Sequence, residues 1–138
     1  MNKYEILKRY FGYDTFRTGQ EELVDALLGG RDVLGIMPTG AGKTLCYQVP
    51  ALMMSGVTLV VSPLISLMKD QVNALVQQGI SAAYLNRSLT DVQYNKALRN
   101  AANGQYKIIY VAPERLESAA FLNMCRYVTA QQSPLYQN

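Results

Sequence analysis

Eight consecutive residues combine glycines, a lysine and a threonine at a spacing that suits phosphate binding. They are Met37, Pro38, Thr39, Gly40, Ala41, Gly42, Lys43 and Thr44. Closely spaced glycines let successive backbone N–H groups converge on phosphate oxygens, and a helix that follows offers its positive N-terminal end. Lys43 would reach the terminal phosphates, and the Thr44 hydroxyl can ligate Mg²⁺. The segment therefore predicts a site for a nucleoside triphosphate with magnesium.

The elements on either side of this loop match the setting that such a site needs. The apolar run 32–37 reads as a strand, and a helical pattern follows Lys43. The widest form of the phosphate-loop pattern has glycine where this chain has Met37, whereas the shorter G-x-G-K-T core is intact. The segment is thus predicted to be a strand, a phosphate-binding loop and a helix in succession.

Composition limits the remaining chemistry. A chain of 138 residues with 49% hydrophobic residues is long enough for one globular domain, and a net charge of +3 from scattered cations does not by itself indicate nucleic-acid binding. The absence of histidine excludes Ser-His and Cys-His catalysis and most zinc sites. Cys46 and Cys125 are far apart and are expected to be buried thiols. No signal peptide or membrane-spanning segment is evident in the sequence. We therefore expect a cytoplasmic setting and no membrane partner.

Strand-like and helix-like segments alternate along the chain. Helices are expected over 4–11, 20–28, 64–76 and 90–101, and strands over 57–61, 82–85 and 107–111. The strands at 57–61 and 107–111 read as buried on both faces. Such alternation predicts an α/β fold with a parallel sheet and helices on both faces, which binds ligands beyond the carboxyl ends of its strands.

The segment 11–20, which reads F-G-Y-D-T-F-R-T-G-Q, resembles the adenine-recognition motif of RecQ-type DNA helicases, and residues 37–48 resemble their form of the phosphate loop. The similarity extends over roughly residues 4–126 and implies the first RecA-like motor lobe of a P-loop NTPase. It implies that adenine lies between Tyr13 and Arg17 and that Gln20 reads its edge. Independently of the family, a glutamine amide can donate to and accept from adenine, and an arginine plane stacks on a π face. ATP is therefore the expected nucleotide.

Two later segments resemble motifs Ia and Ib of the same family, which lie along the nucleic-acid strand. They are 60–72, V-V-S-P-L-I-S-L-M-K-D-Q-V, and 110–116, Y-V-A-P-E-R-L. The resemblance implies contacts to single-stranded or partly duplex DNA from Ser62, Pro63, Ser66, Lys69, Pro113 and Arg115. Small hydroxyls and helix N-terminal N–H groups suit phosphate oxygens. For Arg115, a phosphate contact and an ion pair with a neighbouring carboxylate remain alternatives.

The chain departs from the family at its end. The family's D-E-x-H box, whose carboxylates hold magnesium and position the attacking water, has no counterpart in residues 127–138. We therefore expect three parts: an N-terminal helical segment with the adenine motif (1–30), a partial ATP-binding domain (31–126), and a polar tail that is disordered or non-homologous (127–138). Phosphoryl transfer needs several positioned groups, so this chain is expected to bind ATP better than it hydrolyses it.

Three functions fit these patterns to different degrees. The first is the truncated ATP-binding portion of a RecQ-like helicase, an enzyme by family whose parent would act in the bacterial cytoplasm or nucleoid. The second is a non-catalytic module derived from a helicase that binds nucleotide, DNA or a partner protein. The third is a small P-loop kinase, which predicts a lid and catalytic carboxylates that the sequence does not offer. Protein partners and oligomeric state have no signal in the sequence.

Overall fold

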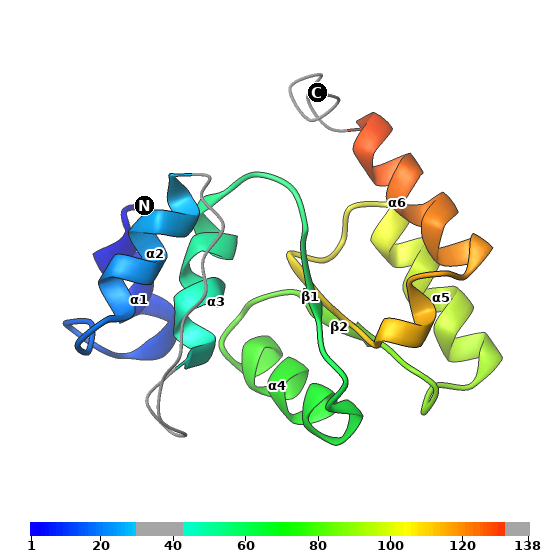
Figure 1. Cartoon of the computed structure of the whole chain (residues 1–138), viewed down its shortest axis with the longest axis horizontal. Coiled ribbons are helices and arrows are strands. Elements are labelled where there is room, and N and C mark those ends of the chain that lie inside the picture. The colour runs from blue at the N-terminus through cyan, green and yellow to red at the C-terminus, as the bar shows by residue number, and fades with distance from the viewer. Residues whose placement is uncertain (30–42, 132–138) are drawn as a thin grey trace. The chain divides into compact units, whose positions relative to one another are not determined.

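The computed structural model describes residues 1–29 and 43–131, which are coloured in Figure 1. The chain divides into two compact units, Met1–Ser55 and Gly56–Asn138. The first unit holds the predicted adenine-motif segment and the whole helix that follows the predicted phosphate loop. The second unit holds the sheet and both segments expected to contact DNA. Each unit is described separately below.

The described residues of the first unit, 1–29 and 43–55, form three helices. They are α1 (Lys3–Phe11), α2 (Gln20–Leu28) and α3 (Lys43–Met53). The predicted helices at 4–11 and 20–28 are thereby confirmed. Side chains from all three helices share one core, with Leu7, Val24 and Val49 fully buried. The predicted strand at 32–37 and the glycine loop up to Gly42 lie outside the described residues.

The second unit alternates strands and helices, as expected. Its elements are β1 (Thr58–Val61), α4 (Ile65–Gln77), β2 (Ala82–Leu85), α5 (Asp91–Ala102), β3 (Ile108–Val111), the 3₁₀ helix η1 (Pro113–Arg115) and α6 (Ala119–Gln131). A reciprocal capping box between Thr90 and Gln93 starts α5. Helix α6 was not predicted. It includes residues 127–131 of the segment that was expected to be a polar tail. Residues 132–138 of that segment lie outside the described part.

The sheet is parallel, with strand order β1-β3-β2. Val61, Val111 and Leu85 stand side by side as the last residues of the three strands. In Figure 1, α4 lies on one side of this sheet and α5 with α6 on the other. The expected α/β architecture with helices on both faces is confirmed. Because the strands are parallel, the loops that follow all three of them emerge at one edge.

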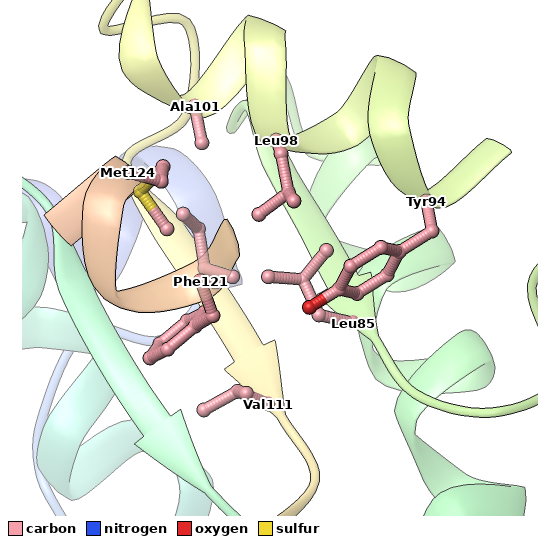
Figure 2. Close-up of a cluster of buried hydrophobic side chains, with 8 residues drawn as sticks. Leu85, Tyr94, Leu98, Ala101, Val111, Phe121 and Met124 are labelled. Carbon is pink, nitrogen blue, oxygen red and sulfur yellow. The ribbon is translucent and has the colours of Figure 1, made fainter. Parts of the chain in front are cut away.

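The main core of this unit lies between the sheet and the helices α5 and α6. Figure 2 shows its side chains converging from α5, α6 and two strands: Leu85, Tyr94, Leu98, Ala101, Val111, Phe121 and Met124. Each large apolar side chain buried in this way contributes about 1.5–3 kcal/mol. The 3₁₀ helix η1 connects β3 to α6. Because both of these elements contribute to the core, the core fixes the two ends of η1.

Strand β1 differs from its prediction. It was expected to be buried on both faces, yet its burial alternates, and Leu59 and Val61 are 39% and 51% exposed. The reason is its position: among the described residues β1 pairs with β3 alone, and α5 and α6 pack on β2 and β3. By register, Leu59 and Val61 share a face with Ile109 and Val111. The sheet face that carries the core therefore extends to β1, where its apolar side chains are exposed.

This edge predicts self-association of the isolated chain. An unpaired strand that carries exposed apolar residues can pair with another chain, and a lysine there prevents such pairing. At about 100 µM, we expect the wild type to sediment partly as dimers or larger species and Val61→Lys to sediment as a monomer.

The matched control is Val76→Lys on α4, since Val76 is 54% exposed but lies away from the sheet edge. It should associate as the wild type does. Sedimentation velocity of the three proteins decides the matter. A monomeric wild type, or equal association by all three, would contradict the role assigned to β1.

The structure also bears on the two cysteines and on the question of a membrane-spanning helix. Cys46 and Cys125 are thiols rather than halves of a disulfide, with Cys46 buried and Cys125 partly buried. Burial raises the pKa of both thiols, so both are poor nucleophiles at neutral pH. Within residues 1–29 and 43–131, no helix has the length and apolar character that crossing a membrane requires.

Candidate functional site

The segment between α1 and α2 carries the residues predicted to hold adenine. Gly12 ends α1 with a φ of 77°, a left-handed conformation that glycine adopts without steric cost. The chain then turns into the segment that holds Tyr13 and Arg17, both exposed, with Tyr13 at 50%. Two of the predicted adenine contacts are therefore presented to solvent in the first unit.

The third predicted contact, Gln20, has a structural partner. Its side chain is 1% exposed, and its Oε1 accepts a hydrogen bond of 2.7 Å from the backbone N–H of Arg17. The Gln20 backbone N–H donates in return to the Arg17 carbonyl at 3.0 Å. These two bonds close the turn, with Gly19 at a φ of 86°. Gln20 thus positions Arg17, a role that the sequence did not indicate.

A cluster of charged and aromatic side chains joins α1 to α2 beside this segment. Lys3 Nζ lies 2.6 Å from Asp25 Oδ1 and 2.7 Å from Glu21 Oε2. The Tyr4 hydroxyl donates to Glu21, and the Tyr4 ring packs against Phe16 at 5.9 Å between centroids. The pKa of Lys3 is raised by Asp25 and then by Glu21, while Lys3 and then Tyr4 lower the pKa of Glu21. The cluster anchors the predicted adenine-binding segment at both of its ends.

The Glu21 interactions predict a defined pH dependence. The folded-state pKa of Glu21 lies below its usual value of 4.5, so its stabilising effect is present above that pH and is lost as the pH falls through the folded pKa. Glu21→Gln should therefore melt at a lower temperature than the wild type at about pH 6, with the difference shrinking towards about pH 3.

Thermal unfolding followed by circular dichroism at both pH values measures this effect. Glu22→Gln is the control, because Glu22 is exposed and is in none of the ion pairs of the described residues. It should change the melting temperature little at either pH. If Glu21→Gln lowered the melting temperature equally at both pH values, the pKa argument would be wrong.

The helix after the predicted phosphate loop begins at the expected residues. α3 opens with Lys43 and Thr44 and runs for 11 residues, so its N-terminal N–H groups and positive dipole end are at the G-K-T sequence. Thr44 is partly exposed. A lysine, a hydroxyl and the positive end of a helix are a set of groups that fits a triphosphate with Mg²⁺. The remaining loop residues, Met37, Pro38, Thr39, Gly40, Ala41 and Gly42, lie outside the described residues.

The residues predicted to contact DNA gather at one edge of the sheet in the second unit. Ser62 follows β1 and Pro113 begins η1 after β3, and the Ser62 N–H donates to the Val111 carbonyl at 3.1 Å. Ser62 Oγ accepts from the Leu64 N–H at 3.1 Å, just before α4. The α4 N-terminus has no side-chain cap, and Ser66 lies in its first turn. This edge therefore brings two serine hydroxyls together with the positive N-terminal end of α4.

This edge also carries the two cations and the two prolines that were predicted to contact DNA. Lys69 is exposed on α4, one turn beyond Ser66, and Pro63 and Pro113 are exposed in the two loops. Arg115 is in none of the ion pairs of residues 1–29 and 43–131, so the carboxylate partner considered for it is not found there. Its guanidinium carbon instead lies 4.5 Å from the centroid of the Tyr94 ring.

Asn86 is a buried polar residue at this edge that was not predicted to belong to the site. Asn86 follows β2, is 1% exposed, and its Oδ1 accepts from the N–H of Ser88 at 2.8 Å and from the Ser88 hydroxyl. The turn so formed leaves Arg87 exposed. An asparagine directly after an apolar strand is a signal for such a turn. A third loop thus joins those after β1 and β3 at the carboxyl edge.

Comparison with known proteins places the chain in a family. A family model described as DEAD/DEAH box helicase matches residues 17–133. The chain is 50% identical over 122 residues to the ATP-dependent DNA helicase RecQ of Haemophilus influenzae, covering 88% of this chain and 20% of that protein. It is 48% identical over 120 residues to the protein of the same name from Bacillus subtilis, covering 86% and 20%. It is 45% identical over 114 residues to the mouse ATP-dependent DNA helicase Q1, covering 81% and 18%.

These matches have two consequences. The chain spans about one fifth of the length of the curated relatives that it matches. The family match covers most of the chain, including the phosphate-loop sequence and all three strands of the sheet. The chain therefore belongs to the DEAD/DEAH box helicase family, and its predicted resemblance to RecQ-type helicases is confirmed.

Proposed function

We propose that this chain is the ATP-binding portion of a RecQ-like DNA helicase, whose complete form couples ATP hydrolysis to movement on single-stranded DNA and duplex unwinding. Residues 1–30 would supply adenine recognition and residues 31–126 the partial ATP-binding domain. The proposal rests mainly on one observation: α3 begins at Lys43, in the same compact unit as the adenine-motif residues. The names of the relatives, which include "ATP-dependent DNA helicase", agree with it.

The nucleotide would be held by two groups of residues. Tyr13 and Arg17 would stack on adenine, and Gln20 would read its edge. An amide carbonyl oxygen can accept two hydrogen bonds, so the bond from Arg17 does not by itself exclude one from the adenine amino group. Residues 37–44 would hold the phosphates, with Lys43 neutralising charge on the terminal ones and Thr44 contributing its hydroxyl to Mg²⁺. Magnesium would supply further charge neutralisation on the phosphates.

DNA would bind at the carboxyl edge of the sheet. The positive N-terminal end of α4, which has no side-chain cap, would attract a phosphate, with Ser62, Ser66 and Lys69 nearby in the sequence. Pro113 and Arg115 follow the neighbouring strand β3. Such contacts go to the backbone and carry little sequence information, which suits a protein that moves along DNA.

The chain as given should bind ATP but turn it over slowly. It has no D-E-x-H sequence, and hydrolysis by this mechanism needs carboxylates for magnesium and for the attacking water. This absence is also the observation that favours the second candidate, a module that binds nucleotide or DNA without motor activity. A motor-derived site predicts that the two ligands affect each other's affinity, because binding is coupled when both favour one state.

Equilibrium binding of a fluorescent ATP analogue with Mg²⁺, with ATP and GTP as competitors, tests the proposal. We expect saturable binding, better competition by ATP than by GTP, and ATP turnover near background with and without single-stranded DNA. Failure to bind the analogue would contradict the nucleotide site. DNA-stimulated turnover would overturn the claim of incomplete hydrolytic machinery. Binding of both ligands without any mutual effect would favour the non-catalytic module.

A further inference from the structure

Arg115 is held by an aromatic ring from another element. It ends η1, and the Tyr94 ring belongs to α5, 21 positions earlier in the chain. Tyr94 is 8% exposed and is one of the core side chains, extending from α5 beside Leu85 in Figure 2. A ring so enclosed has little freedom to move, because core side chains pack densely. The guanidinium therefore rests on a rigid surface.

The local backbone reinforces this arrangement. The Arg115 N–H donates to the Ala112 carbonyl at 3.0 Å, and the Ser118 N–H donates to the Arg115 carbonyl at 3.2 Å. The Tyr94 hydroxyl lies 3.5 Å from Ser118 Oγ, and that oxygen accepts from the Phe121 N–H at 3.1 Å, in the first turn of α6. Tyr94 thus contacts Arg115 through its ring and the start of α6 through its hydroxyl.

The charges around Arg115 do not explain its position. Glu114 and Glu117 are exposed neighbours in sequence, and neither forms an ion pair with it among the described residues. Its Nε atom is buried and has no hydrogen-bond acceptor in the described part of the protein, while the residue as a whole is partly exposed. Stacking rather than ion pairing therefore fixes this guanidinium.

We propose that Tyr94 is a positioning residue for nucleic-acid binding, which holds the Arg115 guanidinium by cation–π stacking so that its N–H edge meets a backbone phosphate of single-stranded DNA. The inference rests on the proposed function, because it uses the DNA-binding role of the same sheet edge. A guanidinium held over a ring by its carbon still has N–H groups at its edge, which can donate to phosphate oxygens. Arginine also loses less freedom on binding when its orientation is already fixed.

Affinity of the full chain for fluorescent oligo(dT), measured by anisotropy over a range of salt concentrations, tests this proposal. Arg115→Gln should weaken binding about tenfold and reduce the salt slope by about 0.7, the value for one phosphate contact on a single strand. Tyr94→Leu should weaken binding about three- to tenfold, and Tyr94→Phe should retain wild-type affinity because it keeps the ring. In the double variant Tyr94→Leu/Arg115→Gln, affinity should be no lower than in Arg115→Gln alone.

Leu98→Ala is the matched control for loss of core packing. Leu98 is on the same helix and in the same core as Tyr94, with the same 8% exposure, and it is not the ring on which Arg115 stacks. It should destabilise the second unit without changing the salt slope of DNA binding. If folded Tyr94→Leu bound oligo(dT) as the wild type does, or if the two substitutions were additive, the proposal would be overturned.

A spectroscopic measurement on the wild type covers the case in which Tyr94→Leu does not fold. The Arg115 Nε–Hε resonance, assigned by its loss in Arg115→Gln, should be shifted upfield by the Tyr94 ring current and should move when oligo(dT) is added. An unshifted resonance, or one that oligo(dT) leaves in place, would overturn the proposal. Two failures are distinguishable: a wild type that does not bind oligo(dT) refutes the DNA-binding function and this inference together, whereas full affinity in Arg115→Gln refutes this inference alone.

Discussion

Lys43→Ala should weaken binding of the magnesium–ATP complex by about 10- to 100-fold. Lys43 is the cation of the G-K-T sequence and the first residue of α3, next to the helix N-terminus that would receive the phosphates. A hydrogen bond between charged groups contributes about 1.5–3 kcal/mol, and each 1.4 kcal/mol corresponds to a factor of ten in affinity. Alanine favours helix at least as well as lysine, so the substitution should leave α3 intact. Loss of affinity would therefore report lost phosphate contact.

The measurement is titration with the fluorescent ATP analogue in the presence of Mg²⁺, with circular dichroism as a check of folding. Lys69→Ala is the matched control, because Lys69 is an exposed helical lysine of the second unit, predicted to contact DNA rather than nucleotide. It should bind the analogue as the wild type does. Equal affinities for Lys43→Ala and the wild type would show that the G-K-T sequence is not a phosphate site in this chain.

Phe121→Ala should destabilise the second unit by about 3–5 kcal/mol. Phe121 is 2% exposed and lies in the centre of the core between α6, α5 and the sheet in Figure 2. Removing a buried aromatic ring loses its transfer free energy and leaves a cavity that the surroundings fill incompletely. Since small domains are stable by only about 5–15 kcal/mol, such a loss should leave a large unfolded fraction under mild conditions.

Urea unfolding followed by circular dichroism measures this change, and the adjacent residue provides the control. Leu122 is on the same helix, next to Phe121, but is 40% exposed. Leu122→Ala should change the unfolding midpoint little. The loss in Phe121→Ala should also abolish oligo(dT) binding at urea concentrations that the wild type tolerates, because the core holds η1. Similar midpoints for the two variants would mean that α6 does not pack on the sheet as described.

Most helices could be located from the sequence because their signals are local. The end of α1 at Gly12 and the start of α5 at Thr90 depend on residues within one helical turn. The α/β class also followed, since alternating strands and helices can bury their apolar faces in few other ways. α6 was not predicted, although its terminal turns are no less marked than those of α4: neither helix has an acidic residue in its first turn or a basic residue in its last turn, and α4 was located from its apolar stripe.

The exposure of β1 could not be predicted in this way. Its sequence, T-L-V-V, has the apolar and β-branched character of a fully buried strand. Whether such a strand is covered depends on its place in the sheet, and β3, which follows both other strands in the sequence, lies between β1 and β2. Strand order is set by contacts between residues far apart in sequence, which no local pattern encodes.

For the candidate site, the sequence by itself predicted the chemistry and determined the family. The phosphate-loop sequence, the adenine motif and the two strand-end loops predicted a RecQ-like protein, because phosphate and base recognition need particular residue types at short, local spacings. Tertiary structure alone decided what holds these groups: Gln20 binds the turn at Arg17, and Tyr94 supports Arg115. The physical reason is that a side chain's partner depends on which elements pack together, and packing joins residues that the sequence keeps apart.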